Sequence, residues 1–598
     1  FTAGSKKVNK DLKKISHMIK SLWHYLSKRR KKQILGLLIL MVLASFFEVI
    51  GIGVVLPFLG VLAAPEHLFQ HPLMQPLIKV LDISESNELI LPITILFIIT
   101  VIVVGTIRTI LLYAITRLSC AIGSDISVGL YRQTLYQDYA VHLQHNSSKI
   151  INLITSKTNI VINQIIYPTL ILISSILVLI AVITTLFFVD TVATLTAIFG
   201  FGFFYCLVIY FTREKLKNNS LCIADQTSKM VKLLQEGLGG IRDVIIDGAQ
   251  KFYCQLYGIA DSTFRRATGN NQFISGSPKY LLEAIGMILI AVLAYVIFQQ
   301  NGISTALPVL GTLALGAQRL LPISQQAFNS YSLINGARSS FKDVMHLLEQ
   351  PSTKYADQAS LKPIPFEKEI KLDNVSFRYT EEAPIVLKDI SVTIKKGERV
   401  GFVGKTGSGK STMLDIIMGL LSPSSGQLIV DHQSINIQNR SAWQSHIAHV
   451  PQNIFLSDTS VAENIAFGVS LEKINYKRVR EASKKAQIAE LIEGWPEQYQ
   501  TLVGERGIRL SGGQRQRIGI ARALYKEASV LIFDEATSAL DSTTEQSVMS
   551  AIEDLGKDLT ILIIAHRLTT LKSCNKIFNL EKDNKIHILN YNEVLGIK

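Results

Sequence analysis

Long apolar stretches alternate with long polar segments through the first half of the chain. The apolar stretches are long enough to cross a bilayer as helices, because about 20 consecutive apolar residues span its hydrocarbon core. There are six of them, at 33–63, 89–118, 164–189, 191–213, 279–299 and 304–334. The pattern predicts a short N-terminal segment, 1–32, followed by a six-helix transmembrane domain, 33–334.

Basic residues gather at one side of the predicted spans. A basic block at 28–32 precedes the first span, and Arg213 with two nearby lysines follows the fourth. Since Lys and Arg favour the cytoplasmic side of a membrane, we expect a cytoplasmic N-terminus. Six crossings then return the C-terminal half to the cytoplasm. The polar segments 119–163 and 214–278 would extend the spans into the cytoplasm as continuous helices.

The predicted outer loop, 64–88, contains a short amphipathic stretch at 71–81. Two interpretations remain open for it. An amphipathic helix can lie on the bilayer surface with its apolar side in the lipid. Equally, a loop helix can turn the same apolar side toward neighbouring helices.

Beyond residue 334 the composition becomes that of a soluble domain. We expect a linker over 335–368, where Gln350-Pro351-Ser352-Thr353 carries turn-forming residues. Over 369–598, short β-branched runs such as 400–403 and 530–533 alternate with helical segments. This alternation is typical of an α/β domain with a largely parallel sheet.

The most specific motif in the chain is glycine-rich and lies between a predicted strand and the helical run Thr412–Leu421. It consists of Gly404, Lys405, Thr406, Gly407, Ser408, Gly409, Lys410 and Ser411. Glycines in such a loop let backbone N–H groups approach phosphates at a helix N-terminus. Lys410 can reach the β- and γ-phosphates of ATP, and the Ser411 hydroxyl can bind Mg²⁺. A chance glycine turn is disfavoured by the strand and the helix that flank the loop.

Two carboxylates and a histidine follow later buried strands. Asp534 and Glu535 end the run 530–533, and His566 follows the run 561–564. In parallel sheets, ligands bind at the carboxyl ends of the strands. We expect Asp534 to hold Mg²⁺ through water, Glu535 to act as general base on the attacking water, and His566 to contact the γ-phosphate.

A second glycine-rich turn opens a helix between these groups, with the sequence Leu510, Ser511, Gly512, Gly513 and Gln514. With it, the domain resembles an ATP-binding cassette (ABC) protein, and the fold class expected is an α-helical transmembrane domain of the ABC exporter type plus an α/β P-loop domain. The resemblance assigns Tyr379 to adenine stacking, Thr412 to ATP binding, Gln452 to the metal and to catalysis, and 538–541 to the D-loop. Segment 503–507 resembles an exporter-specific loop.

In this family the Ser-Gly-Gly-Gln turn completes the ATP site of the opposite subunit. The resemblance therefore implies a dimer, and the intact Glu535 and His566 favour a homodimer with two active sites. It also implies that loops near 140–151 and 240–254 couple the membrane helices to the cassettes. ATP and Mg²⁺ are the cofactors expected.

Ionisable residues at membrane depth are costly and are candidates for cargo binding. Glu48, Arg108, Glu283 and Arg319 stand out, with three glutamines near the last of them. An arginine in the cavity can pair with a phosphate or pyrophosphate through its planar donors. Alternatively, Arg108 and Arg319 pair internally with Glu48 or Glu283, or reach a lipid headgroup.

The first span, Ser45–Leu59, and the amphipathic outer-loop stretch resemble the lipid-linked oligosaccharide flippases of bacterial protein glycosylation. In that family, cationic residues bind the pyrophosphate of a polyprenyl carrier, which makes Arg319 the first candidate for cargo binding and Arg108 the second. The resemblance implies a bacterial inner membrane location. Lipid A, a peptide or a drug remain alternative cargoes, and an ATP-gated channel or regulatory subunit is a further alternative.

The net charge of +14 raises the possibility of nucleic-acid binding. Much of the excess flanks apolar stretches, where the positive-inside rule accounts for it, so we expect no nucleic-acid partner. Five cysteines are present, and none has the spacing of a metal site. We expect them to be free thiols.

Overall fold

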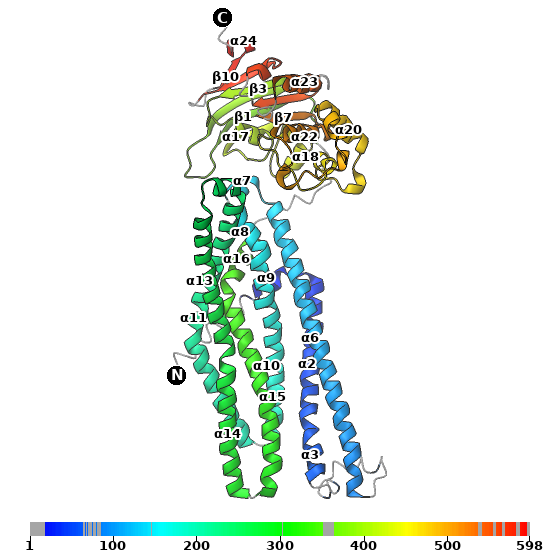
Figure 1. Ribbon diagram of the computed structural model, residues 1–598, viewed down its shortest axis with the longest axis vertical. Coiled ribbons are helices and arrows are strands. Elements are labelled where there is room, and N and C mark those ends of the chain that lie inside the picture. The colour runs from blue at the N-terminus through cyan, green and yellow to red at the C-terminus, as the bar shows by residue number, and fades with distance from the viewer. Residues whose placement is uncertain are drawn as a thin grey trace. The chain divides into compact units, whose positions relative to one another are not determined.

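The computed structural model describes residues 18, 20–63, 66, 69, 75, 79, 85–144, 146–189, 191–301, 303–350, 364–535, 541–553, 558–564, 568–581 and 586–594. The chain forms two compact units (Figure 1). The helical unit comprises Phe1–Leu135 and His145–Pro351, and the α/β unit comprises Tyr136–Gln144 and Ser352–Lys598.

Long helices make up the helical unit. They are α2 (Lys28–Gly53), α3 (Val55–Ala63), α6 (Ile90–Leu135), α10 (Tyr167–Val189), α11 (Thr191–Gly239), α13 (Gln250–Gly276), α14 (Pro278–Asn301), α15 (Ile303–Gly336) and α16 (Arg338–Glu349). Shorter turns connect them: η1 (Ser86–Leu89), α8 (Ser147–Asn152), η2 (Leu153–Lys157), α9 (Thr158–Val161), η3 (Ile162–Ile166) and α12 (Ile241–Ile246). Turns η2 and η3 are π-helical. Each of the six apolar stretches of the sequence lies within this set of helices.

Within the described residues, three helical stretches are long and apolar enough to cross a membrane, at Lys28–Gly53, Ser86–Leu135 and Ser147–Phe188. Helices α6 and α11 continue well past their apolar parts. On α6, Leu91, Ile99 and Ile102 are more than half exposed. Such exposed apolar faces suit contact with lipid tails rather than with water. The stretch 71–81 lies outside the described residues, apart from Gln75 and Lys79.

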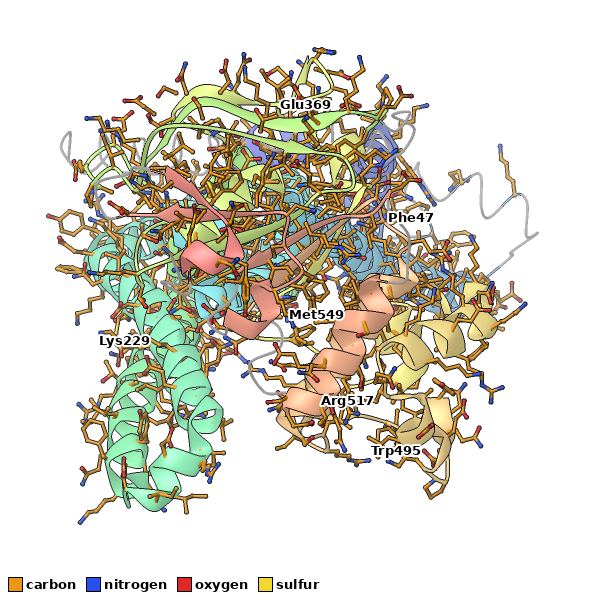
Figure 2. The ribbon with its side chains drawn as sticks, turned by 90° about the horizontal axis from the view of Figure 1, so that it is seen from above. Phe47, Lys229, Glu369, Trp495, Arg517 and Met549 are labelled. Carbon is orange, nitrogen blue, oxygen red and sulfur yellow. The ribbon has the colours of Figure 1, made fainter. Side chains whose placement is uncertain are left out.

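Side chains from several helices form the main core of the helical unit. It includes Met41 on α2, Ile115 and Ile122 on α6, and Val344 on α16. Helix α2 packs against α6 and α10, α10 packs against α15, and α11 packs along α13. In Figure 2, Lys229 marks α11, which lies alongside α13.

The α/β unit contains two sheets. Its strands are β1 (Glu369–Phe377), β2 (Leu387–Lys395), β3 (Arg399–Gly404), β4 (Ser425–Val430), β5 (Gln433–Ser434), β6 (Ile447–Val450), β7 (Val530–Asp534), β8 (Thr560–Ile564), β9 (Lys576–Leu580) and β10 (Ile586–Leu589). A six-stranded sheet has the order β10-β9-β3-β8-β7-β6, with only β10 antiparallel to its neighbour. A four-stranded antiparallel sheet, β2-β1-β4-β5, adds a layer that the sequence analysis did not anticipate.

Helices of the α/β unit surround these sheets. They are α7 (Tyr139–Gln144), α17 (Lys410–Ile417), α18 (Arg440–Gln444), α19 (Val461–Ile465), α20 (Tyr476–Lys485), α21 (Ala489–Glu493), α22 (Gly512–Tyr525), α23 (Ser542–Glu553) and α24 (Tyr591–Val594). Helix α17 ends four residues before the predicted run does. The reason is Gly419, which adopts φ +65°, a left-handed conformation that ends helices and that glycine adopts without a Cβ penalty.

Candidate functional site

The glycine-rich loop joins β3 to α17, as the motif predicts. Gly404, Gly407 and Gly409 all have positive φ, at 145°, 83° and 92°. A Cβ added at Gly404 would lie 2.4 Å from the carbonyl oxygen of Leu580. Only glycine fits this position, because the loop passes close to the backbone of β9 and has a left-handed φ there.

The surroundings of the lysine and serine side chains in the loop indicate a binding site for an anionic ligand. Nζ of Lys410 donates to the carbonyl oxygens of Gly404 (2.9 Å) and Lys405 (3.1 Å), within the loop itself. Lys410 is only 8% exposed, and Ser408 Oγ is buried with no hydrogen-bond partner among the described residues. A buried cation and an unused hydroxyl beside open backbone N–H groups fit the phosphates of ATP. Ser411 lies in the first turn of α17, with its side chain exposed.

The predicted adenine-stacking residue borders the same loop. Tyr379 is 41% exposed, and its ring packs edge-on against Phe377 at a centroid distance of 5.0 Å. Its hydroxyl forms a hydrogen bond of 3.0 Å with Oγ1 of Thr412 on α17. The ring is therefore fixed next to the phosphate loop while part of its face stays accessible to a base.

The parallel register brings the predicted acidic pair to the edge of the sheet that carries the loop. Ile564 on β8 lies opposite Phe402 on β3 and opposite Asp534 on β7. Glu535 follows with φ +50°, a conformation uncommon for a non-glycine residue. Gln452 Nε2 donates to Glu535 Oε2 at 2.7 Å. The structure thus joins two predicted catalytic residues that are 83 positions apart in sequence.

Two predicted parts of the site lie outside the described residues. These are His566 and residues 538–540 of the D-loop. Asp541, the last residue of that loop, accepts hydrogen bonds from Thr543 and Thr544 at the start of α23. These bonds lower the pKa of Asp541, mainly through the Thr543 hydroxyl.

The second glycine-rich turn forms the N-terminus of α22. Ser511 caps the helix: its Oγ accepts from Gln514 N at 3.3 Å, and its N–H donates to Gln514 Oε1 at 2.8 Å. This reciprocal capping box fixes the turn. Gly512 and Gly513 occupy the first two helical positions, where backbone N–H groups lack intrahelical partners. The helix end is thus ordered and suited to an anionic group.

Asp415 is a feature of this site that the sequence analysis missed. It lies on α17, and burial together with the negative charge of Asp534 raises its pKa to about 6. Burial, together with the negative charge of Asp415, raises the pKa of Tyr139 on α7. The sequence signal that could have identified Asp415 is its position as a lone carboxylate in the apolar run 412–421.

Helix α7 contacts the α/β core directly. Arg440 on α18 forms an ion pair with Asp138 at 2.5 Å, and Ala140 packs against the core cluster that contains Trp443. The chain leaves the helical unit at Leu135 to form this short helix and returns at His145. The contact falls at the start of the predicted coupling loop at 140–151.

The ionisable residues proposed for cargo binding have different surroundings. Arg108 Nε lies 3.4 Å from Glu48 Oε2, and the Glu48 side chain is only 2% exposed. This is the internal pair that the sequence analysis kept as an alternative. Glu283 pairs with Lys279 on the same helix, at 3.9 Å. Arg319 is part of α15, but its side chain lies outside the described residues.

Comparisons with known proteins agree with this geometry. The family "ABC transporter transmembrane region" matches residues 33–306, and the family "ABC transporter" matches 387–538. A relative named ATP-dependent lipid A-core flippase, from Alkalilimnicola ehrlichii, is 30% identical over 403 residues, 67% of this chain and 67% of that protein. A leukotoxin translocation ATP-binding protein, LktB, from a Pasteurella haemolytica-like species is 36% identical over 286 residues, 47% of this chain and 39% of that one.

A solved structure shares the fold across nearly the whole chain. It is described as a bacterial Atm1-family ABC exporter with ATP bound, and it aligns with a TM-score of 0.76 at 21% identity over 95% of this chain and 96% of that one. The chain belongs to the ABC transporter family as an exporter half-transporter, a multi-pass membrane protein whose cassette binds ATP and whose ATPase activity is coupled to transport.

Proposed function

We propose that this protein uses ATP hydrolysis to move an anionic, amphipathic glycolipid from the inner to the outer leaflet of a bacterial inner membrane. The specific cargo we propose is a polyprenyl-pyrophosphate-linked oligosaccharide. The name of the Alkalilimnicola relative specifies a lipid cargo, which supports the lipid part of the proposal. The N- and C-termini would lie in the cytoplasm, in line with the basic block at 28–32.

A basic cavity in the helical unit is the observation that carries the cargo proposal. The cavity has a volume of about 430 Å³ and lies between α11, α15 and α16. Its four cationic lining residues are Arg213, Lys217, Arg338 and Lys342, and Glu214 is its one acidic lining residue among those described. Lys217, Arg338 and Lys342 make no ion pair with any described acidic residue. Such a cluster suits a phosphate or pyrophosphate.

The basic cavity lies where a lipid headgroup is expected. Arg213 is the residue at which the fourth apolar stretch ends, so the cavity begins at the end of that span that we propose faces the cytoplasm. A polyprenyl chain would remain in the membrane while its pyrophosphate reaches these cations. Arg319 lies on α15, which also lines this cavity, and we keep it as the first candidate for a second contact with the cargo.

We assign ATP hydrolysis to Glu535 as general base, with Gln452 holding its carboxylate at 2.7 Å. The backbone N–H groups of 404–411 and Lys410 would bind the phosphates. Oxygen donors from Ser411, Gln452 and Asp534 fit the preference of Mg²⁺ for hard ligands. When bound, Mg²⁺ neutralises charge that develops on the phosphates. His566 would contact the γ-phosphate.

Two copies of the chain would form the working transporter. The capped N-terminus of α22 would bind the γ-phosphate of the nucleotide held by the partner. Helix α12 supports the same arrangement, because Ile241, Ile245 and Ile246 are 47%, 58% and 70% exposed at the tip of a helical hairpin. An apolar tip outside the membrane calls for a protein partner, and the partner's cassette is the one we propose.

The basic cavity can be tested with the double variant Arg338→Gln/Lys342→Gln in lipid nanodiscs. We expect the concentration of polyprenyl-pyrophosphate oligosaccharide that half-maximally stimulates ATPase activity to rise by about tenfold or more, because each lost charged hydrogen bond costs about 1.5–3 kcal/mol. Basal ATPase activity should stay within about twofold, since these residues lie outside the nucleotide site. Lys232→Gln, which removes an exposed lysine on α11, is the matched control.

An unchanged concentration dependence in the double variant would remove the basic cavity from the cargo site. Lipid A is the second candidate cargo, favoured by the name of the Alkalilimnicola relative. It also carries phosphate and sugar, so the same assay run with lipid A in place of the polyprenyl lipid decides between the two. Stimulation by an uncharged drug and by neither lipid would contradict the proposal.

A further inference from the structure

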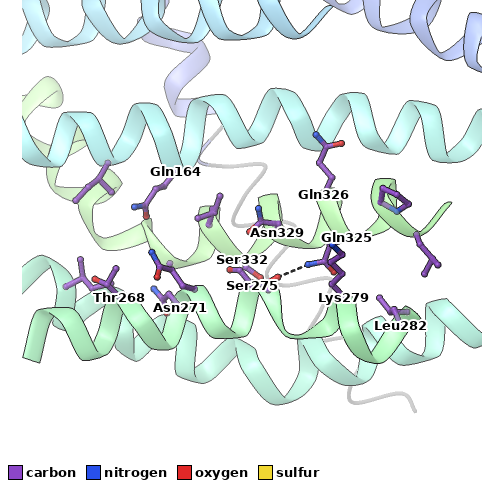
Figure 3. Close-up of a pocket in the computed structure, with 18 of the residues that line it drawn as sticks. Gln164, Thr268, Asn271, Ser275, Lys279, Leu282, Gln325, Gln326, Asn329 and Ser332 are labelled. Carbon is purple, nitrogen blue, oxygen red and sulfur yellow. Dashed lines mark hydrogen bonds between the residues drawn. The ribbon is translucent and has the colours of Figure 1, made fainter. Parts of the chain in front are cut away.

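A second, larger cavity lies in the helical unit. It has a volume of about 730 Å³ and is bounded by α9, η3, α11, α13, α14 and α15. This volume falls in the range of pockets that hold drug-sized ligands, about 300–1,000 Å³. Figure 3 shows polar side chains converging on it from several helices, including Gln164 from η3, Thr268 and Asn271 from α13, and Gln325 and Asn329 from α15.

The lining of this cavity is rich in amides and carries no net charge among the described residues. Six amide side chains contribute: Gln164, Asn271, Gln272, Gln325, Gln326 and Asn329. Hydroxyl groups come from Thr268, Ser275 and Ser332. The two charged lining residues, Lys279 and Glu283, lie 3.9 Å apart and offset each other. So many amides are unusual in the hydrophobic core of a protein, because each buried polar group needs a hydrogen-bond partner.

Several of these polar groups have hydrogen-bonding capacity to spare. Gln325 Nε2 donates to the Ser275 carbonyl oxygen at 2.8 Å, which fixes the side chain, while its Oε1 is buried without a partner. Ser332 is 1% exposed, and its Oγ also has no partner among the described residues. The side chains of Gln164 and Asn329 make no hydrogen bond with any described residue. The unused groups include both donors and acceptors.

We propose that this amide-lined cavity binds the sugar part of the cargo through hydrogen bonds to its hydroxyl groups. A sugar hydroxyl both donates and accepts, and an amide side chain offers a donor and an acceptor side by side. A neutral lining does not attract an anion, which separates this cavity from the basic cavity. This inference rests on the proposed function and assigns to the glycan a site distinct from that of the pyrophosphate.

The two cavities meet at α15. Asn335 lines the basic cavity and Gly336 the amide-lined one. A Cβ on Gly336 would lie 3.0 Å from Asn271 Nδ2, so α13 and α15 approach closely at this point. In the proposed cargo the pyrophosphate is joined directly to the sugars. The neighbouring basic and amide-lined cavities would therefore bind adjacent parts of one headgroup.

The test uses the full-length protein in nanodiscs and two lipids, polyprenyl pyrophosphate with and without its oligosaccharide. We expect wild type to respond at a lower concentration to the glycosylated lipid. Gln325→Leu or Asn329→Leu should raise the half-maximal concentration of the glycosylated lipid about five- to tenfold, the effect of losing roughly one hydrogen bond. Their response to the sugar-free lipid should not change. Gln255→Leu, an exposed position on α13 outside the cavity, is the matched control.

A second measurement is independent of transport. Saturation-transfer difference NMR with a free neutral trisaccharide should show transfer to wild type and to Gln255→Leu, and reduced transfer to Gln325→Leu. A neutral tripeptide serves as the competing probe, because a peptide backbone also offers donors and acceptors. Binding of the tripeptide but not of the trisaccharide would overturn the assignment.

The outcomes separate this inference from the proposed function. Equal stimulation by the two lipids, with cavity variants that do not discriminate between them, would overturn the glycan site and leave pyrophosphate-lipid transport in place. If neither lipid stimulates hydrolysis, the proposed function fails. Absence of trisaccharide binding in the NMR measurement overturns the glycan site by itself.

Discussion

At the residue scale, the proposed nucleotide site contains a few side chains in unusual conformations or surroundings. Glu535 adopts φ +50° and keeps its carboxylate against Gln452. A non-glycine residue in this region costs about 1–3 kcal/mol and persists where the surrounding structure enforces it, as at functional sites. The types and order of these residues were predictable from motifs. The contact between Gln452 and Glu535 was not, because it depends on the register of distant strands.

The pKa of Asp415 leads to a prediction of pH-dependent stability. Its ordinary value of 3.8 is raised to about 6 in the folded protein by burial and by Asp534. Between about pH 4 and pH 6 the carboxyl group keeps its proton in the folded protein but loses it in the unfolded chain, so the free energy of unfolding falls as the pH rises through this range. Above pH 6 the folded protein holds the unfavourable charge, and this loss of stability is complete. Asp415→Asn removes this charge. We expect about 1 kcal/mol of stabilisation at pH 7.5, after allowance for partial exposure.

Thermal unfolding of the nucleotide-free protein at two pH values checks this expectation. The midpoint for Asp415→Asn should exceed that of wild type by about 2–4 °C at pH 7.5 and by about half as much at pH 5. Asp458→Asn, at an exposed position, is the control and should match wild type at both pH values. A difference that is the same at both pH values, or a lower midpoint, would contradict the role given to the charge of Asp415.

At the element scale, apolar length and strand–loop–helix order predicted most of the fold. The six apolar stretches lie in helices, and strands β3, β7 and β8 fall where the runs of β-branched residues are. The antiparallel sheet β2-β1-β4-β5 was missed, although β2 follows β1 and β5 follows β4 directly in sequence; only the β1–β4 pairing joins more distant segments. The two cavities were missed because the polar faces of α11, α13 and α15 meet only after the helices pack.

We propose that helix α7 transmits changes at the nucleotide site. It is anchored by the Asp138–Arg440 ion pair and lies close to Asp415. Because α7 follows α6 directly in sequence, weakening its anchor should weaken coupling. We expect Asp138→Asn to keep basal ATPase activity within about twofold of wild type and to reduce lipid stimulation about fivefold, the effect of roughly 1 kcal/mol.

The swapped pair Asp138→Arg/Arg440→Asp should restore part of the stimulation, as a double-mutant cycle requires of a direct interaction. Asp225→Asn, which removes the exposed pair with Lys229 on α11, is the control. Additive losses in the cycle would show that the ion pair has no role in coupling.

At the scale of the whole molecule, one chain carries one phosphate loop, 404–411, and one Ser-Gly-Gly-Gln turn, 511–514, on separate parts of the α/β unit. The proposed alternating-access cycle accounts for these parts: ATP binding would bring two cassettes together, and hydrolysis would separate them. The family and the ATPase activity were predictable because the motifs are specific. The cargo was not, because it depends on cavity linings that no short motif encodes.

Leaflet translocation in proteoliposomes tests the account most directly. A fluorescent polyprenyl-pyrophosphate oligosaccharide is followed with ATP, without ATP, and in Glu535→Gln. We predict ATP-dependent movement in wild type and intact ATP binding in Glu535→Gln, with hydrolysis and movement both reduced by about 100-fold or more, the contribution of a general base. Hydrolysis near the wild-type rate in Glu535→Gln, or ATP hydrolysis by wild type without movement of this lipid, would contradict the account.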